Sequence, residues 1–177
     1  VINPCDYNQT KAATIAISKH YGPVYLRFGR PSVPNFTDPN LKFEIGKGII
    51  LNQGTDVTII ATGHLVWDAL NAAEHLEEKG IYAEVINIHT IKPIDEKIIL
   101  NSINKTKAVV SAEEHNFHGG LGETVSRILS QNYPAPQEFV ATNDTFGESG
   151  KPAELMNKYG LNKESIIDSC EKVIKRK

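Results

Sequence analysis

Short runs of strand-forming residues alternate with helix-like segments over most of the chain. The apolar runs VTIIA, AEVINI and AVVSA begin at residues 57, 83 and 108, and each precedes a segment with apolar positions at helical spacing. Parallel strands need a long crossover, which is usually a helix. The alternation therefore predicts an α/β fold with a mostly parallel sheet and helices on both of its faces.

One strand of this sheet is expected to run antiparallel to the others. The run GIIL at residues 48–51, the polar turn NQGT and the run that begins at Val57 together suggest a hairpin. Asp95 and Asn162 stand before two of the predicted helices and are suitable N-caps. The closing helices are expected over residues 153–159 and 163–175, separated by Gly160.

The first 39 residues form a different kind of unit. A short strand that ends at Pro4, a helix over residues 9–20 and the strand-forming run PVYLRF give a strand–helix–strand pattern with no further strands to join. The proline-rich stretch that follows indicates a linker. We therefore expect residues 1–39 to be the end of a truncated α/β domain plus its linker, and residues 40–177 to be a second domain.

Composition argues against several classes of partner. The formal net charge is −2 and no basic block is present, so nothing favours a nucleic-acid partner. No apolar run reaches the roughly 18 residues of a membrane span, and no signal-peptide pattern is seen. Cys5 and Cys170 lie near opposite ends of the chain, which is typical of a disulfide-free protein in a reducing cytoplasm.

The loop SAEEHNFHGGLGETV, residues 111–125, is the most functional-looking stretch. Its glycines lead into a helix, and a helix N-terminus can bind phosphate, but HGGLGE is not a dinucleotide fingerprint and three glutamates surround it. His115 and His118 suggest a metal, although zinc needs three or four ligands. A structural turn is the favoured interpretation, and an interface loop at the sheet edge is the remaining alternative.

Two further stretches resemble catalytic segments. His64 directly follows a predicted strand and could act as a general base, although a polar loop or cap position is commoner. The stretch NDTFGESGKP at residues 143–152 contains acids, a serine and glycines, but it has no nucleophile-elbow motif. We interpret it as a packed loop.

Arg27 and Arg30 stand where a predicted strand ends, in LRFGRP. An arginine at such an end can grip a phosphate or carboxylate with two hydrogen bonds. Strand alternation directs Arg27 to one side and leaves Arg30 in the following turn. A surface ion pair is the competing interpretation. Asp6 is similarly ambiguous, either as the N-terminal acid of a helix or as a ligand contact.

Several of these segments together resemble the C-terminal part of the transketolase family. The segments are NPCDYNQTKAA, GPVYLRFGRP, GTDVTIIATGHLVWDALNAAEHLEEKGIYAEVINIHTIKPID, VVSAEEHNFHGGLGETV and FGESGKPAELMNKYGL, and the likeness extends over essentially the whole chain. It is strongest to the separate C-terminal subunit of split transketolases. It is weaker to 1-deoxyxylulose-5-phosphate synthase and to beta subunits of 2-oxo acid dehydrogenases.

The resemblance implies a ketol-transferring enzyme built from three α/β domains. Residues up to about 39 would end its pyrimidine-binding domain, and the rest would be its C-terminal domain. Thiamine diphosphate and Mg²⁺ would lie between subunits, and their binding motif is not found in this sequence. The chain alone would then bind no cofactor and be inactive. Its partners would be an N-terminal transketolase subunit, sugar phosphates of the pentose phosphate pathway, and a second copy joined through the C-terminal domain.

The resemblance carries only two residues over to a site. Arg30 matches the arginine that contacts the sugar phosphate, and Asp6 matches an acid that contacts a substrate hydroxyl. The histidine expected shortly before Asp6 is missing, and no residue carries over as catalytic, cofactor-binding or metal-binding. The loop with His115 and His118 is similar to a turn near the domain interface. A non-catalytic assembly module is the alternative from another functional class.

Overall fold

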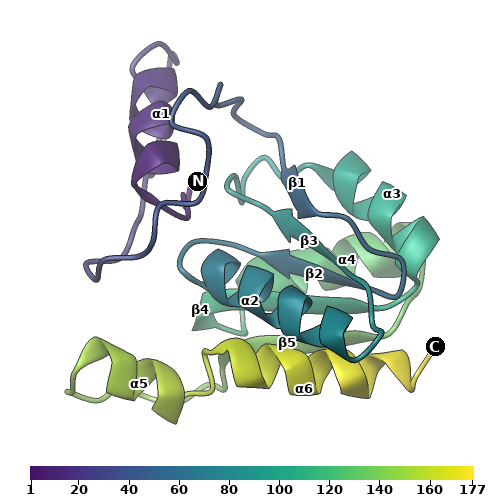
Figure 1. Cartoon of the computed structure of the whole chain (residues 1–177). Coiled ribbons are helices and arrows are strands. Elements are labelled where there is room, and N and C mark those ends of the chain that lie inside the picture. Colours follow the sequence, from purple (N-terminus) through teal and green to yellow (C-terminus); the bar gives the residue numbers. More distant parts are fainter.

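The computed structural model describes residues 1–177 and contains a five-stranded sheet flanked by helices (Figure 1). The strands are β1 (Ile49–Asn52), β2 (Val57–Ala61), β3 (Ala83–Asn87), β4 (Val109–Asn116) and β5 (Gln137–Thr142). The helices are α1 (Tyr7–Ile17), α2 (Leu65–Glu78), α3 (Glu96–Thr106), α4 (Leu121–Asn132), α5 (Pro152–Lys158) and α6 (Lys163–Ile174).

The sheet has the strand order β1-β3-β2-β4-β5. The pairs β2–β3, β2–β4 and β4–β5 are parallel, and β1 runs antiparallel to β3. Every residue of β2 and β3 is buried, as expected for central parallel strands that have helices on both faces. The prediction of an α/β fold with one antiparallel strand is confirmed.

The predicted hairpin between β1 and β2 is wrong, because β3 lies between these strands. The connection passes over the start of β3, where the main-chain N–H groups of Thr55 and Asp56 both donate to the carbonyl of Tyr82. Gly54 lies so close to β3 that a Cβ atom on it would come within 2.2 Å of the Ala83 main chain. The glycine of the NQGT turn therefore serves a crossing rather than a tight hairpin.

Helices cover both faces of the sheet, as predicted. On one face α2 and α6 pack together over a core that includes Ile59, Leu65, Leu76 and Cys170. On the other face α3 and α4 enclose a second core with Ile60 and several other apolar side chains. Cys5 and Cys170 are both buried free thiols, and burial raises the pKa of each.

The helix caps fit the sequence well in the second half of the chain. The Asp95 carboxylate accepts from the N–H of Ile98, and the Asn162 side chain accepts from the N–H of Ser165. The first helix differs, since it begins at Tyr7 and ends at Ile17 instead of extending over residues 9–20. Asp6 caps it two residues earlier than expected.

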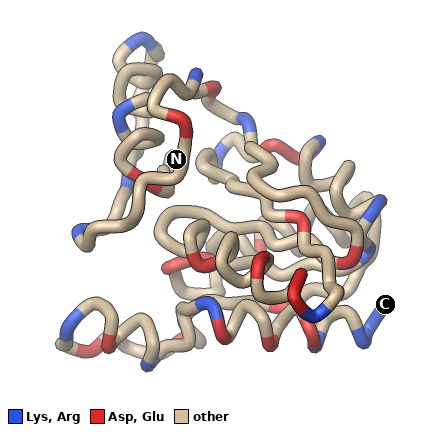
Figure 2. The backbone as a smooth tube through the Cα atoms, viewed as in Figure 1, with Lys and Arg blue, Asp and Glu red and all other residues tan.

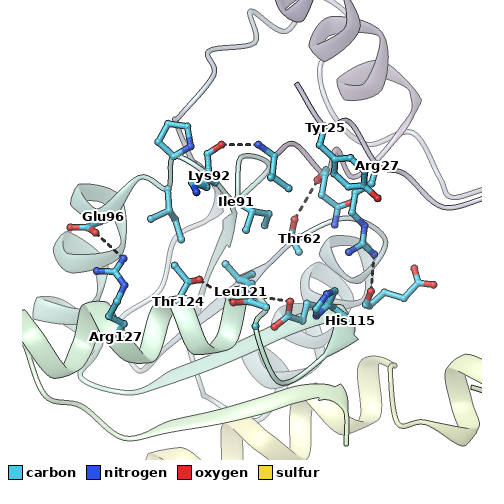
Figure 3. Close-up of a pocket in the computed structure, with 18 residues that line it drawn as sticks. Tyr25, Arg27, Thr62, Ile91, Lys92, Glu96, His115, Leu121, Thr124 and Arg127 are labelled. Carbon is cyan, nitrogen blue, oxygen red and sulfur yellow. Dashed lines mark hydrogen bonds and ion pairs between the residues drawn. The ribbon is translucent and has the colours of Figure 1, made fainter. Parts of the chain in front are cut away.

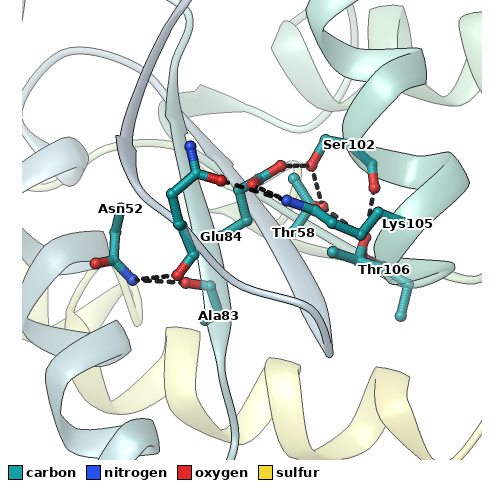
Figure 4. A network of polar contacts seen from close by, with 9 residues as sticks. Asn52, Thr58, Ala83, Glu84, Ser102, Lys105 and Thr106 are labelled. Atoms are coloured by element: carbon teal, nitrogen blue, oxygen red, sulfur yellow. Dashed lines mark hydrogen bonds and ion pairs between the residues drawn. The ribbon is translucent and has the colours of Figure 1, made fainter.

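A polar network crosses the core beneath α3 (Figure 4). Glu84 on β3 has a side chain only 1% exposed and pairs with Lys105, whose side chain is 38% exposed. Ser102 donates to Glu84 and is 2.6 Å from the hydroxyl of Thr58. A buried carboxylate is tolerated here because it has both a cation and a hydroxyl donor.

Helix α1 of the N-terminal segment projects away from the layered sheet (Figure 1). The predicted strands on either side of α1 are reduced to a parallel bridge between Ile2 and Leu26.

Basic and acidic residues are interspersed along the backbone (Figure 2). None of the helices combines the length and the apolar character needed to cross a membrane.

Candidate functional site

The N-terminal segment lies over the carboxyl ends of the parallel strands. The N–H of Asn3 donates to the carbonyl of His89 just after β3, at 2.9 Å, and Ile2 forms an antiparallel bridge with Thr90. The hydroxyl of Thr62, just after β2, donates to the carbonyl of Asn3 at 3.3 Å. This edge is where open α/β sheets usually bind ligands.

Arg30 is exposed at this edge and forms no hydrogen bond or ion pair within the chain. It lines a cavity of about 700 Å³ on one side and a cavity of about 470 Å³ on the other. The competing interpretation of a surface ion pair is therefore wrong. A guanidinium without an internal partner is available to an external oxyanion.

Arg27 points away from Arg30, although the strand predicted here is reduced to an isolated bridge at Leu26. Its guanidinium donates to the carbonyl of Glu114 at 2.8 Å and lines a different cavity, of about 880 Å³ (Figure 3). Across this cavity Arg127 pairs with Glu96 at 3.2 Å. The two arginines of LRFGRP thus have different roles, because only Arg27 is tied to the sheet.

Asp6 is buried and fully engaged. Its carboxylate accepts hydrogen bonds from the N–H of Gln9 at 2.8 Å, which caps α1, and from the N–H groups of Phe36 and Thr37 at 2.9 and 2.8 Å. The hydroxyl of Thr37 donates a fourth bond at 2.7 Å. The side chain fastens the start of α1 to the segment that follows Arg30, and a contact with a substrate hydroxyl stays a prediction.

Two glycines allow the N-terminal segment to approach the turn between β2 and α2. Gly63 has φ +58°, and a Cβ atom on it would lie 2.7 Å from the Asn3 side chain. Gly29 faces the ring of His64, and a Cβ atom on it would lie 2.0 Å from Cε1. Sequence analysis missed this contact, although a glycine directly before a candidate ligand-binding arginine was a usable signal.

His64 lies at the start of α2 with its side chain 13% exposed. Its Nδ1 is 3.4 Å from a carboxylate oxygen of Glu114 at the end of β4. It makes no capping bond to α2. The structure therefore makes it a contact between the sheet edge and the Arg30 segment, and no nucleophile is paired with it.

The glycine-rich loop before α4 already holds an anion of its own. Glu113 is buried, and its carboxylate accepts from the N–H groups of Leu121 and Gly122 at 2.7 and 2.8 Å. Burial raises the pKa of Glu113, and these two donors oppose the rise. A protein carboxylate thus occupies the helix N-terminus where a phosphate would bind. The interpretation of this loop as a structural turn is the one the geometry supports.

The histidines of the same loop serve local contacts. Glu123 accepts from the N–H of Gly119 at 2.8 Å and lies 3.2 Å from Nδ1 of His118, and these contacts lower the pKa of Glu123. His115 contacts the carbonyl of Asn116 at 2.6 Å. The chain contains no group of three or more His, Cys, Asp or Glu side chains placed to hold a metal ion.

The stretch at residues 143–152 is exposed, so its interpretation as a packed loop is wrong. Phe146 is fully exposed, and the segment is tied down by Glu148, which pairs with Lys158 at 2.6 Å, and by a bond from the Tyr159 hydroxyl to the Phe146 carbonyl. It forms one wall of the 700 Å³ cavity beside Arg30.

The sequence matches a known protein family over most of its length. The family described as "Transketolase, C-terminal domain" matches residues 46–166, which is more than half of the chain. The chain belongs to the transketolase family. The resemblance seen in the sequence is thereby confirmed.

Transketolase relatives match over nearly the whole chain. A 6-deoxy-6-sulfo-D-fructose transketolase subunit from a Clostridium species is 44% identical over 100% of the chain and 55% of its own length. A putative transketolase C-terminal section from Methanocaldococcus jannaschii is 43% identical over 99% of the chain and 56% of its own length. One of the subunits of an apulose-4-phosphate transketolase from Phocaeicola vulgatus is 36% identical over 99% and 56%.

Solved structures of transketolases also resemble this chain. A protein described as a split-gene transketolase, an inactive beta4 tetramer, superimposes with a TM-score of 0.95 and 42% identity over 98% of this chain and 57% of that one. Transketolase from Pichia stipitis gives a TM-score of 0.73 at 22% identity, which shows the shared fold. The chain thus spans about half the length of the curated transketolase relatives described above.

Proposed function

We propose that this chain is the C-terminal section of a thiamine-diphosphate-dependent transketolase, which transfers a two-carbon ketol unit between sugar phosphates together with an N-terminal section. The observation that carries the proposal is the guanidinium of Arg30. It is exposed at the carboxyl edge of the sheet, flanked by two cavities, and has no partner within the chain. Such a group suits the phosphate at the end of the substrate remote from the reacting carbonyl.

The names of the relatives support this role for Arg30. One is a transketolase subunit for a 6-sulfonated fructose and another for a 4-phosphorylated apulose. Both sugars carry a tetrahedral oxyanion, which a planar guanidinium can bind with two parallel hydrogen bonds. Binding energy from this remote group would help to position the carbons that react.

The cofactor would be held outside these 177 residues. The chain offers no three-ligand metal cluster, and Glu113 fills the one glycine-rich helix N-terminus. These residues do not fit a site for Mg²⁺ and a diphosphate. In the proposed enzyme, the N-terminal section supplies that site, and the present residues bind and orient the substrate.

Within this proposal Asp6 stabilises the segment that carries Arg30 and does not need to contact the substrate. Its four hydrogen bonds join residue 9 of α1 to residues 36 and 37. Arg30 lies between these points, on the segment that Asp6 closes into a loop. We propose that residues 1–39 are the end of the pyrimidine-binding domain plus a linker and that residues 40–177 are the C-terminal domain, through which two copies of the cytoplasmic enzyme would associate.

A second candidate function has a specific observation behind it. A 1-deoxy-D-xylulose-5-phosphate synthase from Desulforudis audaxviator is 33% identical over 95% of this chain. That enzyme class also uses phosphorylated sugars, so Arg30 would have the same task. Donor choice separates the two, because a synthase takes its two carbons from pyruvate and a transketolase takes them from a ketose phosphate.

The test is reconstitution. The chain would be combined with its N-terminal section, thiamine diphosphate and Mg²⁺, and assayed with a ketose phosphate or pyruvate as donor and an aldose phosphate as acceptor. We expect ketol transfer from the ketose phosphate only when both sections are present. Inactivity with every ketose donor would contradict the proposal, and turnover of pyruvate alone would favour the synthase. Calorimetry should detect no magnesium-dependent cofactor binding to residues 1–177 alone.

A further inference from the structure

The segment that carries Arg30 has very few bonds of its own. The N–H of Arg27 donates to the carbonyl of Ile2 at 2.9 Å, and the next hydrogen-bonded position along the chain is Asn35, whose side chain accepts from the N–H of Tyr7 at 3.2 Å. Residues 28–34 make no hydrogen bond within the chain. Packing must therefore fix the direction in which the Arg30 side chain leaves the backbone.

The packing partner at this point is His64. A Cβ atom on Gly29 would lie 2.0 Å from Cε1, 2.2 Å from Nε2 and 2.9 Å from Nδ1 of His64, so the ring lies directly against the glycine. A side chain of any size at position 29 would displace either the ring or the segment. The ring is well buried, with its side chain 13% exposed.

Glu114 holds both sides of this contact. Its carboxylate lies 3.4 Å from Nδ1 of His64, and its carbonyl accepts from the guanidinium of Arg27 at 2.8 Å. One residue near the end of β4 thus contacts both Arg27, two positions before Gly29, and the ring that lies against Gly29. The residue that follows Gly29 immediately is Arg30.

We propose that His64 and Glu114 are positioning residues for phosphate recognition, and that they act by fixing the Gly29–Arg30 peptide against the carboxyl edge of the sheet. The inference rests on the proposed function, since it gives Arg30 the terminal phosphate. It assigns a task in substrate specificity to residues of the C-terminal domain, β4 and the β2–α2 turn. His64 itself needs no contact with the substrate.

A double-mutant cycle between His64 and Arg30 tests the proposal. The reconstituted enzyme would be assayed with ribose 5-phosphate and ribose as acceptors, and phosphate selectivity is defined as the ratio of their kcat/KM values. We expect His64→Ala to lower this selectivity by roughly tenfold, because a small misplacement of a binding group has effects of this size or larger. The loss should come from the KM for ribose 5-phosphate.

The decisive comparison uses an Arg30→Ala background. There, His64→Ala should leave the remaining selectivity unchanged within about twofold, because a positioning residue has no effect once the group it positions is gone. If the two effects on selectivity multiply instead, His64 contacts the phosphate itself and the proposal is overturned. If His64→Ala lowers kcat/KM equally for both acceptors, its role is only structural, and the proposal is overturned as well.

Gly29→Ala tests the same contact by adding a Cβ atom that would clash with the His64 ring. It should lower phosphate selectivity in the wild-type background, and the Gly29→Ala/His64→Ala double variant should be no worse than Gly29→Ala alone, because the ring that clashes is absent. Glu114→Ala should act in the same direction with a smaller effect, since its side chain is 44% exposed. Simple multiplication of the Gly29 and His64 effects would contradict the geometry.

A matched control is available on the same helix. His75 pairs with Glu78 at 3.5 Å on the exposed face of α2, so His75→Ala should leave selectivity unchanged. The failures can be told apart. A wild-type assembly without any ketol transfer would overturn the proposed function and this inference with it, whereas an active assembly with unaltered selectivity in His64→Ala would overturn the inference alone.

Discussion

Replacing Asp6 with alanine should destabilise the chain far more than an ordinary surface substitution. Asp6 is 3% exposed, and its carboxylate accepts four hydrogen bonds, one of which caps α1. Loss of an N-cap costs about 1 kcal/mol. The main-chain donors of Phe36 and Thr37 would also lose their acceptor, at roughly 1–2 kcal/mol each. The expected loss in the free energy of unfolding is therefore about 3–5 kcal/mol.

Trp67 provides a direct readout of this change. It is the single tryptophan of the chain, and its ring lies 5.4 Å from that of Phe36, next to the fastened segment. Urea titration followed by tryptophan fluorescence and by far-ultraviolet circular dichroism would give the free energy of unfolding. Asp38→Ala is the matched control, since Asp38 is exposed and accepts one bond, from the N–H of Asn40 at 2.8 Å.

The result also separates the two roles considered for Asp6. Asparagine is as good an N-cap as aspartate, but its amide group cannot accept from Phe36 and Thr37 as a second carboxylate oxygen does. Asp6→Asn should therefore lose about 1–3 kcal/mol. A loss below about 1 kcal/mol for Asp6→Ala, beside a large fall in activity, would refute the structural role and restore the substrate contact.

The remaining predictions concern the core, acid stability and the segment boundary. Burial lowers the pKa of His89 to about 4, so the unfolded chain binds more protons between pH 6.5 and 4 and the free energy of unfolding should fall as the pH drops through that range. His89→Gln should remove roughly 3 kcal/mol of this pH dependence. If urea titrations give the wild type and the variant the same pH dependence, the prediction is contradicted. Lys105→Met should lower the free energy of unfolding by about 2 kcal/mol, because the buried carboxylate of Glu84 then has no cation beside it. Adding Glu84→Leu to the same chain should recover most of that loss in a urea titration. Equal losses for the single and the double variant would contradict this prediction. Limited proteolysis should cut within residues 32–40 and leave a stable fragment that starts near Leu41, and early cuts inside residues 56–177 would count against that boundary.

Local signals in the sequence predicted much of the fold. The runs that became β2 and β3 are mostly apolar because both faces of a central parallel strand are buried, and a polar exception such as Glu84 is hydrogen-bonded inside the core. Asp95 and Asn162 marked helix starts because a cap needs only residues that are near in sequence. These features depend on neighbours within a few positions, so a single sequence is sufficient to show them.

The errors arose where a partner distant in sequence decides the outcome. The strand β1 pairs with β3 and not with β2, a choice set by the crossing of Gly54 over Ala83. The sequence left the role of Asp6 open between a helix N-terminal acid and a ligand contact, because its donors at Phe36 and Thr37 lie thirty or more positions away. No spacing rule connects such residues.

The site was predicted only in part, because some of its contacts also join residues that are distant in sequence. Arg30 could be identified because an arginine at the end of a predicted strand can bind an oxyanion with two hydrogen bonds, and its role in binding phosphate stays a prediction. For the contact between Gly29 and His64 the signal was only partial, since the glycine before Arg30 suggested a close approach but nothing identified His64 as the partner. Only the fold brings them together at the edge of the sheet.

The measurement that tests the central claim most directly is phosphate selectivity in the reconstituted enzyme with and without the Arg30 guanidinium. We expect Arg30→Ala to lower kcat/KM for ribose 5-phosphate by about 30-fold, equivalent to about 2 kcal/mol, and to change kcat/KM for ribose by less than about twofold. Arg176→Ala, at the far end of the chain where Arg176 pairs with Glu138, should change neither value. Equal losses for the two acceptors in Arg30→Ala would remove Arg30 from the substrate site and contradict the account.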